Sequence, residues 1–413
     1  MKFSITILLI FYWNISFSQP GCTDIQATNY YSGAAVNDGS CLYPPTNLSL
    51  NTLTTLAVPL LNESSGVVVM DGAIWTQIDN TDYSIYRIDT LSASIFQQVT
   101  VNSTINTDWE DLAASDDHLY IGDFGNNYGN RINLHILKIA KTDLTSSAVT
   151  ANAEVINFSY ADQVDFTPYL NNNSFDCEAF FFYNDSLHLF TKDWVNKITK
   201  HYVLPADSGT HIATLVDSFD VNGLITSAAI QNNGVIVLLG YDNTGFAPCF
   251  TWMLYDYQGD QFFSGNKRMF SLGSAISIGQ VEGIDFAGNN FGYITNERFQ
   301  QLTFNVPPQL KSFDLSSYLP PMTTSELLLE EPHTTIKVFP VPTQDEINVL
   351  IIPFRENNIY DLLINDLNGK TVLKEKNIQN NTRLNIAKLM TGIYKGEIYM
   401  NNKLVTVLHV VKY

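Results

Sequence analysis

The sequence has few cationic residues and, beyond its first twenty residues, no long hydrophobic run. Its 413 residues include 22 Lys and Arg against 41 Asp and Glu, which gives a formal net charge of −19. A surface with this excess of negative charge repels phosphate backbones and anionic lipids, so we expect no nucleic-acid partner and favour cationic or neutral ligands. Without a second run of about 20 apolar residues, we also expect no membrane span in the mature chain.

The signatures of several enzyme classes are missing as well. No G-x-S-x-G, H-E-x-x-H or P-loop motif occurs, and the 7 histidines are scattered singly. A carboxylate pair suited to a glycosidase, for example Glu178 and Glu282, is easily found by chance in so acidic a chain. The sequence therefore leaves open whether the protein is an enzyme.

Residues 1–18 have the features of a secretory signal peptide. Lys2 precedes the apolar run FSITILLIFYWNISF, and Ser16 and Ser18 supply the small residues ahead of a cleavage site before Gln19. A lipid anchor on Cys22 is the alternative, but SQPGC lacks the aliphatic residue expected before the small one. We therefore expect an exported chain.

The 4 cysteines are then most simply two disulfides, because exported proteins meet oxidising conditions. Cys22 and Cys41 form the obvious local pair, and Cys177 with Cys249 follows by elimination. Residues 19–45 resemble the short "GCTD…DGSC" cassette found near the start of many secreted bacterial and algal proteins. A disulfide staple is the interpretation we favour, and a cation held by Asp24 and Asp38 is the alternative.

From residue 46 to 318 the chain reads as short alternating strands broken by Gly, Asn and Asp, which predicts an all-β fold. Five related units begin near Ser65, Trp109, Cys177, Ser227 and Val281. Their spacing suits the four-stranded blades of a β-propeller, and a strand near residue 50 would seal the last blade. Six blades are the alternative if residues 138–175 hide a degenerate unit, and a pair of β-sandwiches is the second architecture.

A Pro-, Ser-, Thr- and Glu-containing linker at 319–334 separates this acidic part from residues 335–413. From His333 onward lie 10 of the 22 basic residues but only 7 acidic ones, so residues 1–332 carry a formal −22. The last segment contains alternating strands and an Asn368-Gly369 hairpin signal, which predict a small Ig-like β-sandwich. An ordinary Ig-like binding module is one interpretation of it.

This carboxyl-terminal segment is similar to the sorting domain of the type IX secretion system of Bacteroidota. The resemblance is carried by three patches: Val338, Phe339, Pro340 and Pro342; then Ile364, Asp366, Leu367, Gly369 and Lys370; then Leu389, Gly392, Ile393 and Tyr394. Val341 stands where the family usually has Asn. The resemblance implies that the type IX secretion machinery carries the chain through the periplasm and across the outer membrane, to be secreted or held at the cell surface, with the domain commonly removed afterwards.

Three glutamates recur at one phase of the five units, namely Glu110, Glu178 and Glu282. Because inner strands of a propeller begin near its axis, we expect these carboxylates to converge at one mouth of the central channel. A second polar cluster recurs after the next strand of each unit and is expected near the same end. Its members are Asp79 with Asn80, Asp123 with Asn126, Lys192 with Asp193, Asp242 with Asn243, and Asn296 with Glu297. Hard oxygen ligands of this kind select calcium or magnesium, so a Ca²⁺ site is one hypothesis. The other is a hydrogen-bond network that holds the ring together without metal.

The leading hypothesis for function is an exported or surface-displayed propeller that binds a glycan or a surface protein and is stabilised by calcium. The alternative is a calcium-dependent hydrolase acting at the channel. The recurring Glu-Gly and Glu-Asp pairs and the acidic composition of the chain loosely resemble those of phytase-like hydrolases and regucalcin-like lactonases or esterases. In these families, carboxylates in the channel hold a metal. The motifs DWED and IGDFGNN resemble those of other secreted Bacteroidota propellers.

Overall fold

Two compact units, Met1–Pro320 and Pro321–Tyr413, make up the chain. The structure is a computed structural model that describes residues 19–319, apart from 80–81, 90–91, 103, 289 and 302, and residues 335–412, apart from 340–344, 353–358, 367–369, 380–381, 391 and 401–402. The predicted signal peptide, nearly all of the predicted linker, and Pro340, Pro342 and Gly369 of the sorting motif lie outside the described residues. In the described residues no helix is long and apolar enough to cross a membrane.

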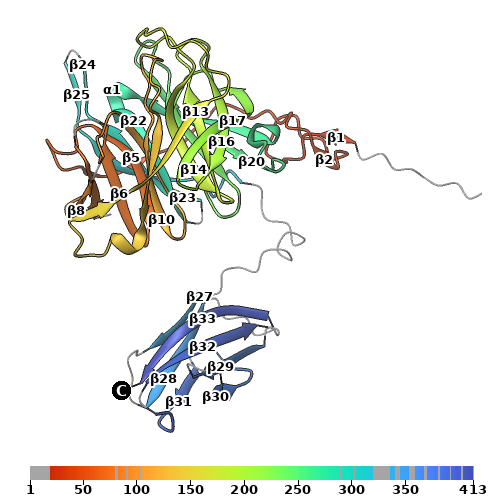
Figure 1. The fold of residues 1–413 in the computed structure, drawn as a ribbon. Coiled ribbons are helices and arrows are strands. Elements are labelled where there is room, and N and C mark those ends of the chain that lie inside the picture. The colour runs from red at the N-terminus through yellow and green to blue at the C-terminus, as the bar shows by residue number, and fades with distance from the viewer. Residues whose placement is uncertain are drawn as a thin grey trace, which may run out of the picture. The chain divides into compact units, whose positions relative to one another are not determined.

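The first unit is a β-propeller of five blades, each built on four antiparallel strands. Figure 1 shows this unit, with strands such as β5, β14 and β22 labelled. Blade 1 contains β5 (Ser64–Met70), β6 (Ala73–Ile78), β7 (Ser84–Ile88) and β8 (Ile95–Asn102). Blade 2 contains β9 (Trp109–Ala114), β10 (His118–Asp123), β11 (His135–Ala140) and β13 (Glu154–Tyr160). Blade 3 contains β14 (Asp176–Tyr183), β15 (Ser186–Lys192), β16 (Ile198–Pro205) and β17 (Gly209–Asp220).

The last two blades complete the ring. Blade 4 contains β18 (Leu224–Ile230), β19 (Ile236–Tyr241), β20 (Pro248–Tyr255) and β21 (Asn266–Ser274). Blade 5 contains β22 (Gln280–Gly288), β23 (Phe291–Glu297), β26 (Gln309–Asp314) and β4 (Asn51–Thr55). Since β4 comes from the beginning of the unit and pairs with β26 from its end, it closes the ring as the sequence predicted. The inner strands β5, β9, β14, β18 and β22 contact one another in that order, and β22 returns to β5.

Hydrophobic side chains fill each of the five interfaces between blades with a separate core cluster. The alternation of each strand sends successive apolar side chains to the two faces of its blade, so every blade has apolar surface on both sides and needs two neighbours. Residues 138–175 supply the end of β11, β12 (Thr150–Asn152) and β13, and they form no sixth blade in the described chain. β12 pairs in parallel with β8 of blade 1. β13 of blade 2 pairs in parallel with β17 of blade 3, and this pairing joins the two blades at their outer edges.

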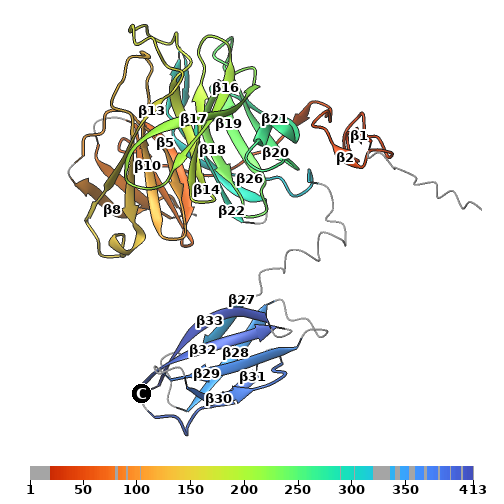
Figure 2. The ribbon, with the colours of Figure 1, turned by 45° about the vertical axis from the view of Figure 1, so that its right-hand side comes forward.

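The amino-terminal cassette lies against blade 4 (Figure 2). It contains the short strands β1 (Pro20–Gly21) and β2 (Val36–Asn37), and β3 (Thr46–Asn47) then pairs with β21. Cys22 and Cys41 form a disulfide, as predicted. The Asp24 carboxylate accepts hydrogen bonds from the hydroxyls of Tyr43 and Tyr255, so tyrosines surround it and tie the cassette to the propeller.

The second predicted disulfide is wrong, because Cys177 and Cys249 are free thiols. Cys177 lies in the core between blades 2 and 3, whereas Cys249 lies in the core between blades 4 and 5. Elimination failed here because a buried thiol packs well as a small apolar side chain, and cysteine in a core needs no sulfur partner.

Short elements complete the two units. The propeller also has the hairpin β24 (Phe299–Gln301) and β25 (Phe304–Val306), the 3₁₀ turns Lys141–Asp143 and Phe262–Ser264, and the single helical turn α1 (Ala275–Ile278). The second unit is a two-sheet sandwich around one core cluster. One sheet contains β27 (Thr335–Phe339), β28 (Glu346–Ile352) and β31 (Thr382–Asn385), and the other contains β29 (Tyr360–Asn365), β30 (Thr371–Glu375), β32 (Gly392–Met400) and β33 (Lys403–Lys412).

Candidate functional site

The beginnings of the five inner strands are packed tightly around the propeller axis. A Cβ atom added to Gly66 on β5 would lie 2.6 Å from the backbone nitrogen of Leu112 on β9, and one added to Gly283 on β22 would lie 2.6 Å from the carbonyl oxygen of Ser65. Ala179 and Ala228 occupy the corresponding positions of β14 and β18. The close approach of neighbouring strands therefore requires glycine at positions 66 and 283.

Asp111 occupies this position in β9, and its side chain crosses to two other blades. Its carboxylate accepts hydrogen bonds from the backbone nitrogens of Phe180 on β14 and Ala228 on β18, both at 3.3 Å, and from Ser227 Oγ at 3.1 Å. Asp111 has no exposed surface, and burial raises the pKa of its carboxyl well above the usual range while these donors oppose that shift. It joins three blades at the axis, between the two mouths of the ring.

The predicted glutamates lie together at the mouth where the inner strands begin. Burial raises the pKa of Glu110, and the nearby carboxylates of Glu178 and Asp108 raise it further. Glu178 in turn interacts with the charge of Glu282, so the three glutamates form one electrostatic group. All three are at most 7% exposed, and Glu282 accepts a hydrogen bond of 2.6 Å from Gln280 Nε2.

Lys192, the last residue of β15, places its ammonium group among these carboxylates. Its Nζ lies 2.6 Å from Glu178 Oε2 and 4.9 Å from the centre of the Trp194 ring. Burial alone would lower the pKa of Lys192, but Glu178, Glu282 and Asp176 raise it well above its ordinary value. This half of the mouth therefore contains a built-in cation, a role that the sequence pattern did not indicate because Lys192 appeared only as one member of a variable polar cluster.

The other half of the mouth, between blades 5 and 1, has a second carboxylate group. One oxygen from each of Glu63, Asp79 and Glu297 lies within 4.8 Å of the others. Burial raises the pKa of Glu297 to about 9, and the charges of Glu282, Glu63 and Asp79 add to the effect. Asp79 and Glu297 belong to the second recurring polar cluster of the sequence. Glu63 lies two residues before Ser65, the recurring position of the first unit, and no sequence pattern pointed to it.

The network of Asp123 and Asn126 adjoins the glutamates. The backbone N–H of Asn126 donates to the Asp176 carboxylate, which interacts with Glu178. Asp123 Oδ1 pairs with Arg131 Nη2 at 2.6 Å, and its Oδ2 accepts the backbone N–H of Thr107 at 3.0 Å. Asn126 Oδ1 accepts the N–H of Arg131, and its side-chain nitrogen donates to the carbonyl of Phe175. These contacts shape the loop after β10 and join it to blade 3.

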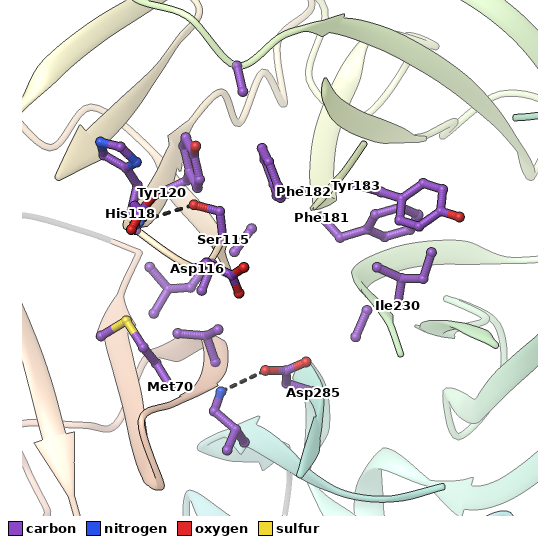
Figure 3. Close-up of a pocket in the computed structure, with 18 of the residues that line it drawn as sticks. Met70, Ser115, Asp116, His118, Tyr120, Phe181, Phe182, Tyr183, Ile230 and Asp285 are labelled. Carbon is purple, nitrogen blue, oxygen red and sulfur yellow. Dashed lines mark hydrogen bonds between the residues drawn. The ribbon is translucent and has the colours of Figure 1, made fainter. Parts of the chain in front are cut away.

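The opposite mouth, where the inner strands end, opens into an axial cavity of about 1060 Å³. Residues of all five inner strands line it, including Met70, Ala114, Phe182, Ile230 and Phe286. Figure 3 shows Phe181, Phe182 and Tyr183 along one side and Asp285 across the opening from them. The Asp285 carboxylate accepts the N–H of Val69 at 2.6 Å, and burial raises its pKa to about 7. The lining combines the ends of the inner strands with the turns that follow them, and because these segments share no motif, no sequence pattern indicated this cavity.

Comparison with known proteins identifies the carboxyl-terminal unit. Residues 337–412 match the family model described as the secretion system C-terminal sorting domain. Gly392 begins β32, and Tyr394 on the same strand is buried and donates its hydroxyl to the carbonyl of Met390 at 2.7 Å. The chain thus carries a type IX sorting domain and is exported, by the type IX machinery, to the cell surface or beyond it. No curated protein sequence matches the chain.

Several solved structures are similar to the propeller at low sequence identity. The PQQ-bound aldose sugar dehydrogenase of Streptomyces coelicolor is 10% identical with a TM-score of 0.37, over 65% of this chain and 99% of that one. The glutaminyl cyclase of Myxococcus xanthus is 11% identical with a TM-score of 0.39, over 65% and 97%. A gluconolactonase of Xanthomonas campestris is 12% identical with a TM-score of 0.32, over 61% and 71%. These likenesses say nothing about activity.

Proposed function

We propose that the protein is an exported binding module whose ligand, a glycan or a protein segment outside the cell, enters the axial cavity. The observation that carries this proposal is the cavity itself, which is about 1060 Å³ in volume and is lined by every blade. That volume suits a ligand the size of a short oligosaccharide or peptide. Its lining offers aromatic rings, carboxylates and amides, which are groups that bind by stacking and hydrogen bonding.

We also propose that a calcium ion stabilises the opposite mouth. Glu63, Asp79 and Glu297 supply oxygens close enough together to share one cation, and oxygen is the ligand atom that calcium prefers. Glu282 lies next to this group and adds negative charge. The Lys192 ammonium opposes the rise in pKa of all three glutamates predicted as ligands, and of these three Glu282 is the one whose charge raises the pKa of Glu297.

A cavity-filling variant tests the binding proposal. Ser115 lines the cavity at the hairpin between β9 and β10, and Ser115→Trp would place an indole ring in it. The purified full chain is applied to arrays of glycans and of peptides, and the ligands retained by the wild type should be lost by Ser115→Trp. Val164→Trp is the matched control, since Val164 is 88% exposed and lies outside the cavity lining. Ligands that bind both variants equally well would contradict a role for the cavity.

The hydrolase alternative places a catalytic metal at the channel mouth, where Glu110, Glu178, Glu282 and Asp123 would act. The Lys192 ammonium lies 2.6 Å from Glu178 and competes with a metal for the same carboxylates, so the geometry favours the binding module. A screen of phosphatase, lactonase and esterase substrates with and without chelator distinguishes the two. Turnover that depends on calcium and is lost in Glu282→Gln would support the hydrolase and contradict the purely binding role.

A further inference from the structure

Acidic side chains dominate the charged lining of the axial cavity. Six aspartates and two lysines line it: Asp71, Asp116, Asp117, Asp185, Asp207, Asp285, Lys138 and Lys141. Asp71, Asp116, Asp117, Asp185 and Asp207 are exposed at hairpins and loops of blades 1, 2 and 3, on that side of the entrance. A concave surface lined by one sign of charge concentrates the electric field and attracts ligands of the opposite sign.

Both lysines of the lining are engaged by other groups. Lys138 Nζ donates to the carbonyl of Ala206 at 2.9 Å, and Lys141 Nζ lies 3.7 Å from Asp71 Oδ1. Within the described part of the chain, Asp116, Asp117, Asp185 and Asp207 form no ion pair. The described residues of the entrance therefore present four aspartates without an ion-pair partner, against the single ammonium of Lys138, which is held by a neutral carbonyl.

Aromatic rings form the wall behind this acidic entrance. The rings of Tyr120 and Phe182 are stacked, with centroids 5.7 Å apart and planes 8° from parallel. Tyr183 and Phe182 are partly exposed and line the cavity, and Figure 3 shows them on the same side of it. Aromatic faces attract ammonium and guanidinium groups, and carboxylates next to such faces strengthen the preference for a cation.

A smaller cavity of about 320 Å³ adjoins the axial cavity and shares Tyr183 and Asn184 with it. It lies over blades 3 and 4 and is lined by Asp256 and Asp260, without a lysine or arginine. Two adjoining cavities with the same charge preference suit an extended ligand that repeats its cationic groups along a chain.

From this arrangement we infer that the ligand of the axial cavity is an extended peptide segment carrying lysine or arginine side chains. The inference rests on the proposed function, because it names the ligand class of the same cavity. A neutral glycan would gain from the aromatic wall but not from the unneutralised carboxylates, whereas a basic peptide uses both. A peptide backbone also supplies N–H donors for Asn184 and Asn232 at the rim.

The test uses fluorescence anisotropy with a fluorescein-labelled peptide of alternating glycine and lysine. The full chain should bind this peptide and bind neither its lysine-acetylated form nor the corresponding glycine–glutamate peptide. Asp117→Asn and Asp185→Asn should each weaken binding about twofold to fivefold, as expected for one partly exposed charge pair. Glu154→Gln is the matched control, since it removes one exposed carboxylate from the outer strand β13 and should leave the affinity unchanged.

Three results would overturn the inference. Equal binding of the acetylated peptide would show that charge is not recognised. Equal weakening by Glu154→Gln would show that only the net charge of the whole chain attracts the peptide. Binding of a neutral oligosaccharide that Ser115→Trp abolishes, with no binding of the basic peptide, would contradict the ligand class while leaving the proposed function intact. If Ser115→Trp abolishes the binding of no ligand on the arrays, both the proposed function and this inference fail.

Discussion

Ser227 Oγ on β18 lies 3.1 Å from both carboxylate oxygens of Asp111 on β9, although these strands belong to blades 4 and 2. Blade 3 lies between them, and the same carboxylate accepts the N–H of Phe180 from that blade. Ser227 also accepts the N–H of Ile284 on blade 5, which extends the network to a fourth blade. Because this contact joins nonadjacent blades, it stabilises the closed ring rather than any single interface.

Replacing Asp111 should therefore destabilise the ring as a whole. Asp111→Ala leaves the buried N–H groups of Phe180 and Ala228 without an acceptor, and each such group costs about 1–3 kcal/mol. We expect a loss of at least about 2 kcal/mol in the free energy of unfolding, measured by urea denaturation. Asp111→Asn keeps one acceptor oxygen and should lose less. Asp143→Ala, at an exposed turn, is the control, and equal stability of Asp111→Ala and the wild type would contradict the role of the network.

The architecture was predictable because it depends on local patterns. Strand alternation, turn residues and the return of one motif gave five blades, and the strand near residue 50 was recognised as the ring closure. The roles of Asp111 and Lys192 were not predictable, since each depends on contacts between strands that lie far apart in the sequence. The sequence placed Lys192 in the same cluster position as Asp79 and Asp123, and only the folded ring shows that its ammonium lies among the glutamates.

Removing the Lys192 charge should expose the repulsion among these glutamates. Lys192→Met keeps most of the side-chain volume, and loss of one partner of a buried pair costs about 3–5 kcal/mol. The difference in the free energy of unfolding between the wild type and the variant should become smaller as the pH falls. The folded variant has carboxyls of raised pKa, which bind protons more tightly than the same carboxyls in the unfolded chain. Lys197→Met is the control, since its pair with Asp242 is partly exposed and should contribute less than about 1 kcal/mol. A deficit of equal size at pH 5 and pH 8 would contradict this account.

Calcium binding at Glu63, Asp79 and Glu297 should release protons. Burial and like charges raise the pKa of Glu297 to about 9, so this carboxyl is mostly protonated at pH 7 and must ionise when a cation binds. Calorimetric titration in two buffers of different ionisation enthalpy should give different apparent enthalpies. Glu297→Gln should leave the melting temperature without calcium nearly unchanged but abolish the increase that calcium causes. Heats that do not depend on the buffer would contradict ionisation of Glu297.

The two free thiols should be unreactive while the protein is folded. Burial raises the pKa of Cys249 to about 12 and that of Cys177 well above its usual range, so neither forms a thiolate at pH 8. Alkylation followed by mass spectrometry should modify neither residue in the native protein and both in guanidinium. Cys22 and Cys41 should react only after reduction. Failure of Cys177 and Cys249 to react in guanidinium without reductant would restore the disulfide that the sequence suggested.

Acid should destabilise the propeller through His188, which is buried between blades 3 and 4. Its Nδ1 lies 2.9 Å from His201 Nε2, and His201 Nδ1 lies 3.0 Å from Asp217 Oδ1. Burial and the neighbouring His201 lower the pKa of His188 to about 3, so the folded state keeps it neutral while the unfolded chain binds a proton below about pH 6.5.

The stabilisation that depends on neutral His188 is thus complete above about pH 6.5 and is lost as the pH falls from there toward 3. Protonation of Asp285, whose pKa is raised to about 7, stabilises the folded state as the pH falls. The pH dependence of the wild type alone therefore does not isolate the contribution of His188. His188→Gln retains a partner for His201 but has no titrating group. Between pH 7 and pH 5 the wild type should lose about 2 kcal/mol of unfolding free energy relative to His188→Gln. A difference between the two proteins that stays constant over this range would show that His188 does not contribute to the acid sensitivity.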